Sequence, residues 1–326
     1  MKTAFTKSGC SGVDGAESER LLDLLAASPR PQPREAIERL LTLSPEELER
    51  RLTHLRTLGV PVAENARGLF VDCPDMLDAR AVAAALQDLP SRPHVEVWRL
   101  CESTNLLAEN GEVPGLYLAE LQTAGRGRRG SAWHQPFAAG LALSFAVPAT
   151  LQRFDGLAVA LAVGVAGALE GQGYEGIRLK WPNDLYFHEA KLGGLMVQAE
   201  GGHAPRLIIG LGLNVHSAPE LEDRATAALD QVALPGVTRN ELAALVVRAL
   251  SEGLERFARH GFAGFAAAYG RLDFLSGRTV RLTTPGGLVA GVVRGVGPVG
   301  DIAIETASGL CHYAAGEVSL GTWQNV

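Results

Sequence analysis

Cysteine is scarce in this chain of 326 residues, and its four cysteines are scattered singly: Cys10, Cys73, Cys101 and Cys311. None of them forms the C-x-x-C pair that zinc sites and redox motifs use. The same spacing argues against the disulfide framework that stabilises small secreted domains. We therefore expect reduced, structural thiols and no metal site built from protein side chains.

Long apolar runs are also lacking. The longest, residues 157–169, spans 13 residues and includes two glycines, so it is too short to cross a bilayer and favours a buried helix. Residues 1–5 lack the apolar stretch of a secretory signal. These two absences predict a cytoplasmic protein that does not enter a membrane.

Acidic residues are missing from one long segment. No Asp or Glu occurs in residues 121–154, although the whole chain carries a net charge of −6. This segment has a local charge of +4 from Arg126, Arg128, Arg129 and Arg153. Positive charge concentrated inside an acidic protein indicates one site for an anionic ligand, whereas the overall charge argues against nonspecific binding of nucleic acid. The sequence thus predicts binding of a phosphate or a carboxylate.

Three of these arginines lie in the glycine-rich segment GRGRRG, residues 125–130. It contains G-x-G-x-x-G, but a second strand pattern follows instead of the helix that a dinucleotide-binding fold requires. A Walker A loop is excluded because Ser131 stands where the lysine is needed. The remaining interpretation is a loop whose backbone approaches a ligand and whose guanidinium groups bind its oxygens in pairs. A solvated surface loop is the less favoured alternative.

A second motif, KWPND, occupies residues 180–184. It places Lys180 at the entry to a Pro-Asn-Asp turn, where its ammonium can face the ligand of the arginine loop. A solvated lysine at the end of a strand is the alternative. For Trp181 the sequence favours a place in the core.

Residues 1–72 divide into a tail and a helical module. Residues 1–18 are rich in glycine, serine and charge and predict a mobile tail. Residues 19–72 contain three short helical patterns and two strand-like segments. Ser44 and the Pro-Glu-Glu after it are typical of a helix start, with a cap, a proline at the first position and acids in the first turn. Three helices and a β-wing form the pattern of a winged helix-turn-helix module.

Residues 80–274 mix strand and helix patterns. The strands are joined by hairpins rather than by regular βαβ units, which predicts an α+β domain with a central mixed sheet. Long helices are expected near residues 154–171 and 239–260. Residues 275–322 contain short strands separated by Pro-Gly turns, which predict a small β-barrel.

Four blocks together resemble the signature blocks of the bifunctional biotin–protein ligases, or biotin–[acetyl-CoA-carboxylase] ligases: residues 125–133, 180–185, 191–195 and 316–320. The resemblance extends over residues 20–320 or so. It implies a winged helix-turn-helix module, a catalytic domain of the biotin/lipoate-ligase type and an SH3-like C-terminal barrel. A biotin-responsive repressor and a lipoate–protein ligase are the alternatives.

The resemblance also implies a reaction. The biotin carboxylate attacks the α-phosphate of ATP to give biotinyl-5′-AMP and pyrophosphate. A lysine of the biotin carboxyl carrier protein of acetyl-CoA carboxylase then attacks this mixed anhydride. Because two anions meet in the first step, fixed cations are the main catalytic requirement. Mg²⁺ is expected to accompany ATP without a sequence mark of its own.

The family's site residues carry over onto matching positions of this chain. Lys180 and Arg128 are the expected catalytic residues. The expected biotin-binding residues are Ser103, Thr104, Asn105, Gln122, Arg126, Gly127, Arg128 and Lys180. The expected ATP-binding residues are Arg126, Arg128, Trp133, Asn183, Lys191 and Asn214.

Two departures limit the resemblance. Family members often carry a basic residue at the positions of Ser131 and Gly321, so a role of the barrel in nucleotide binding does not carry over. In the winged module, five arginines and five glutamates balance to zero over residues 34–58. Acids at the start of the third helix stabilise it but repel DNA phosphates. We therefore expect at most weak binding to an operator; a homodimer is compatible with the resemblance.

Overall fold

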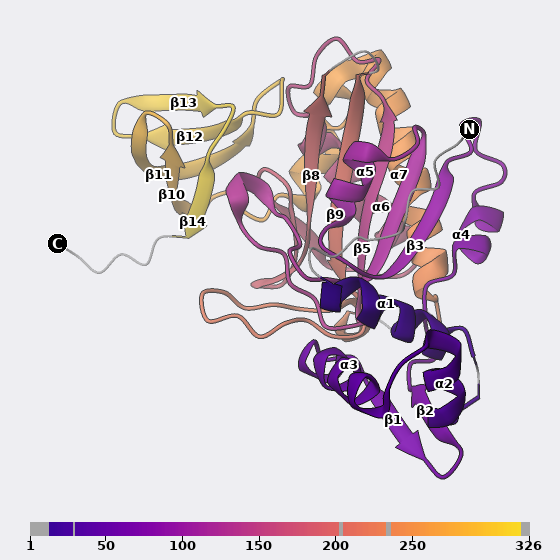
Figure 1. Ribbon diagram of the computed structural model, residues 1–326. Coiled ribbons are helices and arrows are strands. Elements are labelled where there is room, and N and C mark those ends of the chain that lie inside the picture. The colour runs from indigo at the N-terminus through magenta and orange to yellow at the C-terminus, as the bar shows by residue number, and fades with distance from the viewer. Residues whose placement is uncertain (1–12, 29, 202–204, 233–235, 321–326) are drawn as a thin grey trace.

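The computed structural model describes residues 13–28, 30–201, 205–232 and 236–320. Three parts follow one another along the chain: a small helical part, a large central sheet with helices, and a separate C-terminal sheet (Figure 1). Across these ranges, no helix combines the length and apolar character that a bilayer crossing requires. Of the described cysteines, Cys73 and Cys311 are partly exposed free thiols and Cys101 is buried, whereas Cys10 lies outside the described residues.

The helical part contains helices α1 (Val13–Ala26), α2 (Arg34–Leu41) and α3 (Pro45–Thr57) and the antiparallel strands β1 (Val62–Asn65) and β2 (Gly68–Val71). The predicted start of the third helix is confirmed. The Ser44 side chain accepts from the Glu47 N–H, and the Glu47 carboxylate accepts from the Ser44 N–H. This reciprocal pair satisfies two donors that the helix itself leaves unpaired.

The prediction of a mobile tail over residues 1–18 is wrong for residues 13–18, which form the start of α1. Composition suggested a tail, but Leu21, Leu22 and Leu25 of this helix are fully buried, and this packing favours a longer helix. Residues 1–12 lie outside the described residues.

The central sheet is mixed, as predicted. Its seven strands run in the order β3-β4-β5-β9-β8-β7-β6, and only the β3–β4 pair is parallel among the described pairings. In chain order the strands are β3 (His94–Cys101), β4 (Gly115–Gln122), β5 (Gly140–Pro148), β6 (Ile177–Lys180), β7 (Asp184–Phe187), β8 (Ala190–Glu200) and β9 (Arg206–Asn214).

Helices cover both faces of this sheet (Figure 1). Helices α6 (Leu157–Gly171) and α7 (Arg239–His260) lie on one face and α5 (Thr104–Asn110) on the other. Strand β4 shows the alternation that this requires: Leu116 and Leu118 join the α6–α7 core, whereas Tyr117 packs with Ala108 of α5. Two short helices, α4 (Ala79–Ala85) and α8 (Ala266–Leu272), complete the helical layer on the side of α6 and α7.

The C-terminal sheet has five antiparallel strands in the order β13-β12-β11-β10-β14. They are β10 (Thr279–Thr284), β11 (Gly287–Val296), β12 (Ile302–Thr306), β13 (Gly309–Tyr313) and β14 (Glu317–Leu320). The indole Nε1 of Trp181 donates to the carbonyl of Gly300 at 2.9 Å, which fixes this sheet to the turn after β6. Trp181 is buried, as predicted.

The helical part shares its core with the central sheet. Leu52 and Leu55 of α3 belong to one buried cluster with Leu100 of β3, Leu121 of β4 and Phe137. These last three residues belong to the sheet and to the segment after the arginine loop. The helical part therefore supports the end of β4 from below rather than standing apart.

A buried ion pair ties helix α7 to strand β4. Glu120 and Arg239 are both fully buried, and Arg239 Nη1 lies 2.8 Å from Glu120 Oε2. Glu120 Oε1 also accepts from Arg99 at 3.0 Å and from the Leu77 N–H at 2.6 Å. Arg239 further donates to the carbonyl oxygens of Asp75 and Gly140. The network anchors β4 two residues before its last residue.

Replacing Arg239 with methionine is expected to lower the free energy of unfolding by about 3 kcal/mol, because Glu120 keeps a buried charge with fewer partners. Chemical denaturation of the purified variants measures this loss. Arg248→Met on the same helix is the control. It breaks a partly exposed pair with Asp88 and should cost about 1 kcal/mol or less. Equal losses in the two variants would contradict the role given to Glu120.

Candidate functional site

One cavity of about 580 Å³ contains almost all the residues that the sequence singled out. It lies over the ends of β4 and β6, the first half of β8 and the second half of β9, and it is bordered by the arginine loop and the start of β14. Eleven predicted residues line it: Thr104, Asn105, Gln122, Arg126, Gly127, Arg128, Trp133, Lys180, Asn183, Lys191 and Asn214. The prediction that the arginine loop and the KWPND turn face one space is confirmed.

Ser103 is the predicted residue that does not line this cavity. It is the N-cap residue of α5, its side chain is buried, and it makes no capping hydrogen bond. The next two residues, Thr104 and Asn105, line the cavity instead.

A neutral polar group occupies one end of the cavity. The Thr104 N–H donates to Gln122 Oε1 at 2.8 Å, and the Ser144 hydroxyl lies 2.8 Å from Thr104 Oγ1 and 2.6 Å from Asn105 Oδ1. The amide nitrogen of Asn105 is buried without a hydrogen-bond partner. A buried donor of this kind favours a ligand that accepts a hydrogen bond. Sequence reasoning missed Ser144, whose signal is one hydroxyl in an otherwise apolar strand.

The arginine loop is a closed hairpin. The Gly127 N–H donates to the Ser131 carbonyl at 2.7 Å, and the Trp133 N–H donates to the Gly125 carbonyl at 2.8 Å. A Cβ atom on Gly125 would lie 2.4 Å from the Trp133 carbonyl oxygen. At this position glycine is required by the closure of the loop itself.

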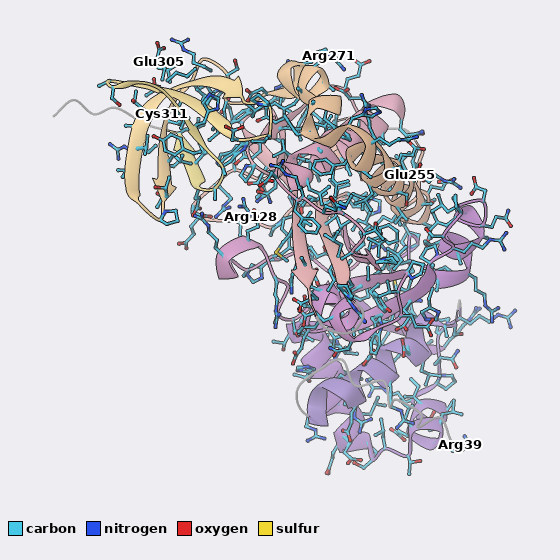
Figure 2. All side chains as sticks on the ribbon, turned by 90° about the horizontal axis from the view of Figure 1, so that it is seen from above. Arg39, Arg128, Glu255, Arg271, Glu305 and Cys311 are labelled. Carbon is cyan, nitrogen blue, oxygen red and sulfur yellow. The ribbon has the colours of Figure 1, made fainter. Side chains whose placement is uncertain are left out.

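Arg128 connects the two motifs. Its Nη1 donates to Asn183 Oδ1 at 2.9 Å, and Asn183 in turn donates to the Leu195 carbonyl at 2.6 Å. Figure 2 shows Arg128 beside the central strands, on the side of the C-terminal sheet. Arg126 points to a different neighbour, because its Nη1 lies 3.7 Å from Glu109 Oε1 of α5. Of these two arginines, Arg126 thus pairs with a carboxylate, whereas Arg128 bonds to a neutral amide.

Lys180 is a desolvated cation. Its ammonium lies 3.4 Å from the Tyr186 hydroxyl. Burial lowers the pKa of Lys180, and the nearby Asp184 carboxylate opposes that shift in part. Asp184 itself pairs with Lys191 at 2.8 Å. A partly buried ammonium of this kind gains strongly from an anionic ligand.

The remaining predicted residues form a wall and a support. The Trp133 indole packs directly on Gly212 of β9, where a Cβ atom would lie 2.3 Å from the ring. The Asn214 amide nitrogen donates to the Ala227 carbonyl at 3.0 Å, while its carbonyl oxygen is buried without a partner. Asn214 thus holds the segment after β9 against the cavity.

The cavity carries a positive charge. Its lining includes six cations (Arg126, Arg128, Arg129, Lys180, Lys191 and Arg224) against three carboxylates (Asp184, Asp223 and Glu317), which gives +3. Arg224 and Glu317 were not singled out as site residues, and Gly321 lies outside the described residues. Among the described residues, no cluster of three His, Cys, Asp or Glu side chains could hold a metal ion. The site therefore suits a ligand with several negative charges and an attached neutral polar group.

Known proteins share this architecture. Residues 98–214 match the model of the biotin/lipoate A/B protein ligase family. The bifunctional ligase/repressor BirA of Escherichia coli is 30% identical over 298 residues, which cover 88% of this chain and 92% of BirA. A biotin–[acetyl-CoA-carboxylase] ligase of Mycobacterium tuberculosis is 31% identical over 220 residues, which cover 65% of this chain and 81% of that protein.

A solved structure supports the same assignment. The biotin protein ligase of Aquifex aeolicus, in complex with biotin and ATP, superposes with a TM-score of 0.61 at 29% identity, covering 70% of this chain and 98% of that one. The match with BirA extends over most of both chains. We conclude that this chain belongs to the biotin protein ligase family.

Proposed function

We propose that this chain activates biotin with ATP to biotinyl-5′-AMP and transfers biotin to a lysine of a biotin carboxyl carrier protein. One observation carries the proposal: a single cavity joins a neutral polar end, at Asn105 and Gln122, to a cationic end at Arg128 and Lys180. Incubation with ATP and either biotin or lipoate tests it, with the acyl-adenylate identified by mass. A lipoyl-adenylate alone would favour the lipoate ligase alternative.

The two ends of the cavity divide the work. We assign the biotin ureido group to Thr104, Asn105 and Gln122, whose amides and hydroxyl can both donate and accept. The biotin carboxylate and the α-phosphate then meet at Lys180 and Arg128, which offset the repulsion between them. As the carboxylate oxygen bonds to the α-phosphorus, pyrophosphate leaves with the electron pair of the broken P–O bond. Arg126, Gly127, Trp133, Asn183, Lys191 and Asn214 complete the proposed nucleotide and biotin contacts.

We also propose a metal ion, Mg²⁺, and a protein partner for this reaction. Among the described side chains, no cluster of three His, Cys, Asp or Glu could hold a metal ion, so any Mg²⁺ would be held by the ATP phosphates. The carrier protein is proposed from the name of the Mycobacterium tuberculosis relative. A cytoplasmic location and a homodimer stay predictions.

Lys180→Met is expected to slow adenylate formation at least about 10²-fold, because the variant loses a fixed charge at the developing phosphorus centre. Single-turnover formation of biotinyl-adenylate measures this, and biotin binding without ATP should change less. Arg178→Met is the matched control on the same strand: Arg178 is exposed and donates to the carbonyl of Arg271. A Lys180 variant with a near wild-type rate would refute the assignment.

Adenylate formation should also fall at alkaline pH. Lys180 acts as a cation, so activity is present below its pKa and is lost as the pH rises through it. Since burial lowers the pKa of Lys180, the midpoint in kcat/KM should lie below the ordinary lysine value. Burial raises the pKa of Tyr186 to about 12, so Tyr186→Phe should keep the same alkaline limb. A midpoint at the ordinary lysine value would contradict the role of burial.

We further propose that residues 13–72, rather than 19–72, form a winged helix-turn-helix module, since α1 begins at Val13. We also propose that residues 80–274 form the catalytic domain and that residues 275–322, of which 321 and 322 lie outside the described residues, form an SH3-like barrel. Three helices followed by a two-stranded sheet support the first boundary, and the five antiparallel strands support the last. The relative from Escherichia coli is named a repressor as well as a ligase, so DNA binding by this module is the second candidate function.

The charges of the module disfavour strong DNA binding. Arg51 of α3 is buried and pairs with Glu17 at 2.7 Å, and Arg34 lies between Glu49 and Glu64. Both arginines thus form ion pairs with glutamates of the same module instead of facing a DNA phosphate. The exposed first turn of α3 carries Glu46, which repels phosphates. We propose that the module contributes mainly to packing.

DNA affinity at about 0.15 M salt is expected to be weaker than the nanomolar range of specific operators, because residues 34–58 carry no net positive charge to displace counterions. Fluorescence anisotropy with the region upstream of its own gene and with biotin-synthesis promoters measures it, with biotinyl-adenylate present. Glu46→Arg should strengthen binding by reversing one repulsive charge. Nanomolar, sequence-selective binding by the wild type would overturn this expectation.

A further inference from the structure

The segment between β9 and α7 brings an unassigned cation to the cavity. Arg224 lines the cavity together with four neighbours in the same segment: Pro219, Leu221, Asp223 and Thr226. The arginine loop ends at Ser131, which has no charge and whose hydroxyl donates to the Arg128 carbonyl at 2.9 Å. Arg224 therefore adds positive charge from an element remote from that loop in sequence.

Backbone hydrogen bonds fix the position of this arginine. The Lys191 N–H donates to the Ala225 carbonyl at 2.9 Å, and the Ala227 N–H donates to the Lys191 carbonyl at 2.8 Å. The Thr226 hydroxyl donates to the Pro219 carbonyl at 2.7 Å and closes the segment on itself. Arg224 directly precedes the bonded stretch, so its backbone is held beside Lys191 of β8.

The present partner of Arg224 is easily replaced. Its Nε donates to the carboxylate of the adjacent Asp223 at 3.0 Å, and the two side chains are 42% and 63% exposed. Exposed pairs of this kind contribute little to stability and exchange readily. By contrast, the Lys191–Asp184 pair is only 16% and 21% exposed. A phosphate oxygen can therefore replace Asp223 as the partner of Arg224 more easily than it can replace Asp184 as the partner of Lys191.

Exposure also orders the cations from the interior to the mouth of the cavity. Lys180 and Lys191 are largely covered, whereas Arg224 faces solvent as well as the cavity. Burial is the main cause of the lowered pKa of Lys180, and the charges of Lys191 and Arg224 add to it, so the three groups act on one space. The part of a ligand that leaves into solvent must pass the mouth.

We propose that Arg224 binds the outer phosphates of ATP and the pyrophosphate formed from them. This inference rests on the proposed ligase function. When the biotin carboxylate oxygen bonds to the α-phosphorus, the bond to the bridging oxygen breaks and its electron pair stays on pyrophosphate. A cation beside that group stabilises the charge it gains. Biotinyl-5′-AMP lacks the outer phosphates and makes no contact with Arg224.

Arg224→Gln tests the proposal in the full-length enzyme. The KM for ATP in adenylate formation should rise about tenfold, as should the KM for pyrophosphate in the reverse exchange reaction, because a charged hydrogen-bond donor is lost. Affinities for biotin alone and for biotinyl-5′-AMP should stay unchanged. Arg224→Lys keeps the charge and should recover most of the loss.

Two further variants sharpen the result. Arg259→Gln removes the same charge from the exposed end of α7, where Arg259 pairs with Glu255. Figure 2 shows Glu255 well away from Arg128, so this control variant should leave both KM values unchanged. Asp223→Asn removes the competing carboxylate and should lower the KM for ATP. Unchanged KM values in Arg224→Gln, or an equal loss of affinity for biotinyl-5′-AMP, would overturn the proposal. A wild-type enzyme that forms no adenylate would refute the ligase function instead.

Discussion

Repulsion among cations gathered in one cavity is the constraint on which the structure depends. Six positive side chains face a partly buried space, and their mutual repulsion must be offset before a ligand arrives. Carboxylates offset part of it, since Lys191 pairs with Asp184 and Arg126 with Glu109. Arg128 bonds instead to a neutral amide, and Lys180 lies beside a neutral phenol. The charge that is not offset is thus concentrated where two anions are proposed to react.

Such a charge distribution requires a rigid frame. Strand β4 carries Gln122 at its end, and the Glu120–Arg239 pair anchors it from the side of α7. From below, Leu121 packs into the cluster that includes Leu52 and Leu55 of the helical part. The C-terminal sheet is held at Trp181, next to Lys180. All three parts of the chain therefore converge on the residues that border the cavity, although only the central part supplies most of its lining.

Local chemistry explains what the sequence could reveal. Ser44 and Glu47 are three residues apart and define a helix start by themselves. The positive charge of the arginine and KWPND motifs is likewise visible in the sequence without knowledge of the fold. Long-range contacts could not be read in this way. Glu120 and Arg239 lie 119 residues apart, and each alone looks like a surface charge. Arg224 sits in a segment without periodicity, and it is the backbone hydrogen bonds of its neighbours Ala225 and Ala227 to Lys191 that bring it to the site. The place of Ser103 could not be predicted either, since a local triplet does not reveal which of its members line the cavity.

The helical part shows how packing and recognition compete for the same charges. An arginine that contacts DNA must present its guanidinium to solvent, but Arg51 is buried against Glu17 and Arg34 is shared by two glutamates. These pairs join α3 to α1 and to α2, and α2 to the β1–β2 hairpin. The same glutamates that lower the positive potential of the module thus hold its elements together. Because this module also covers Leu100, Leu121 and Phe137, it supports the central sheet whether or not it binds DNA.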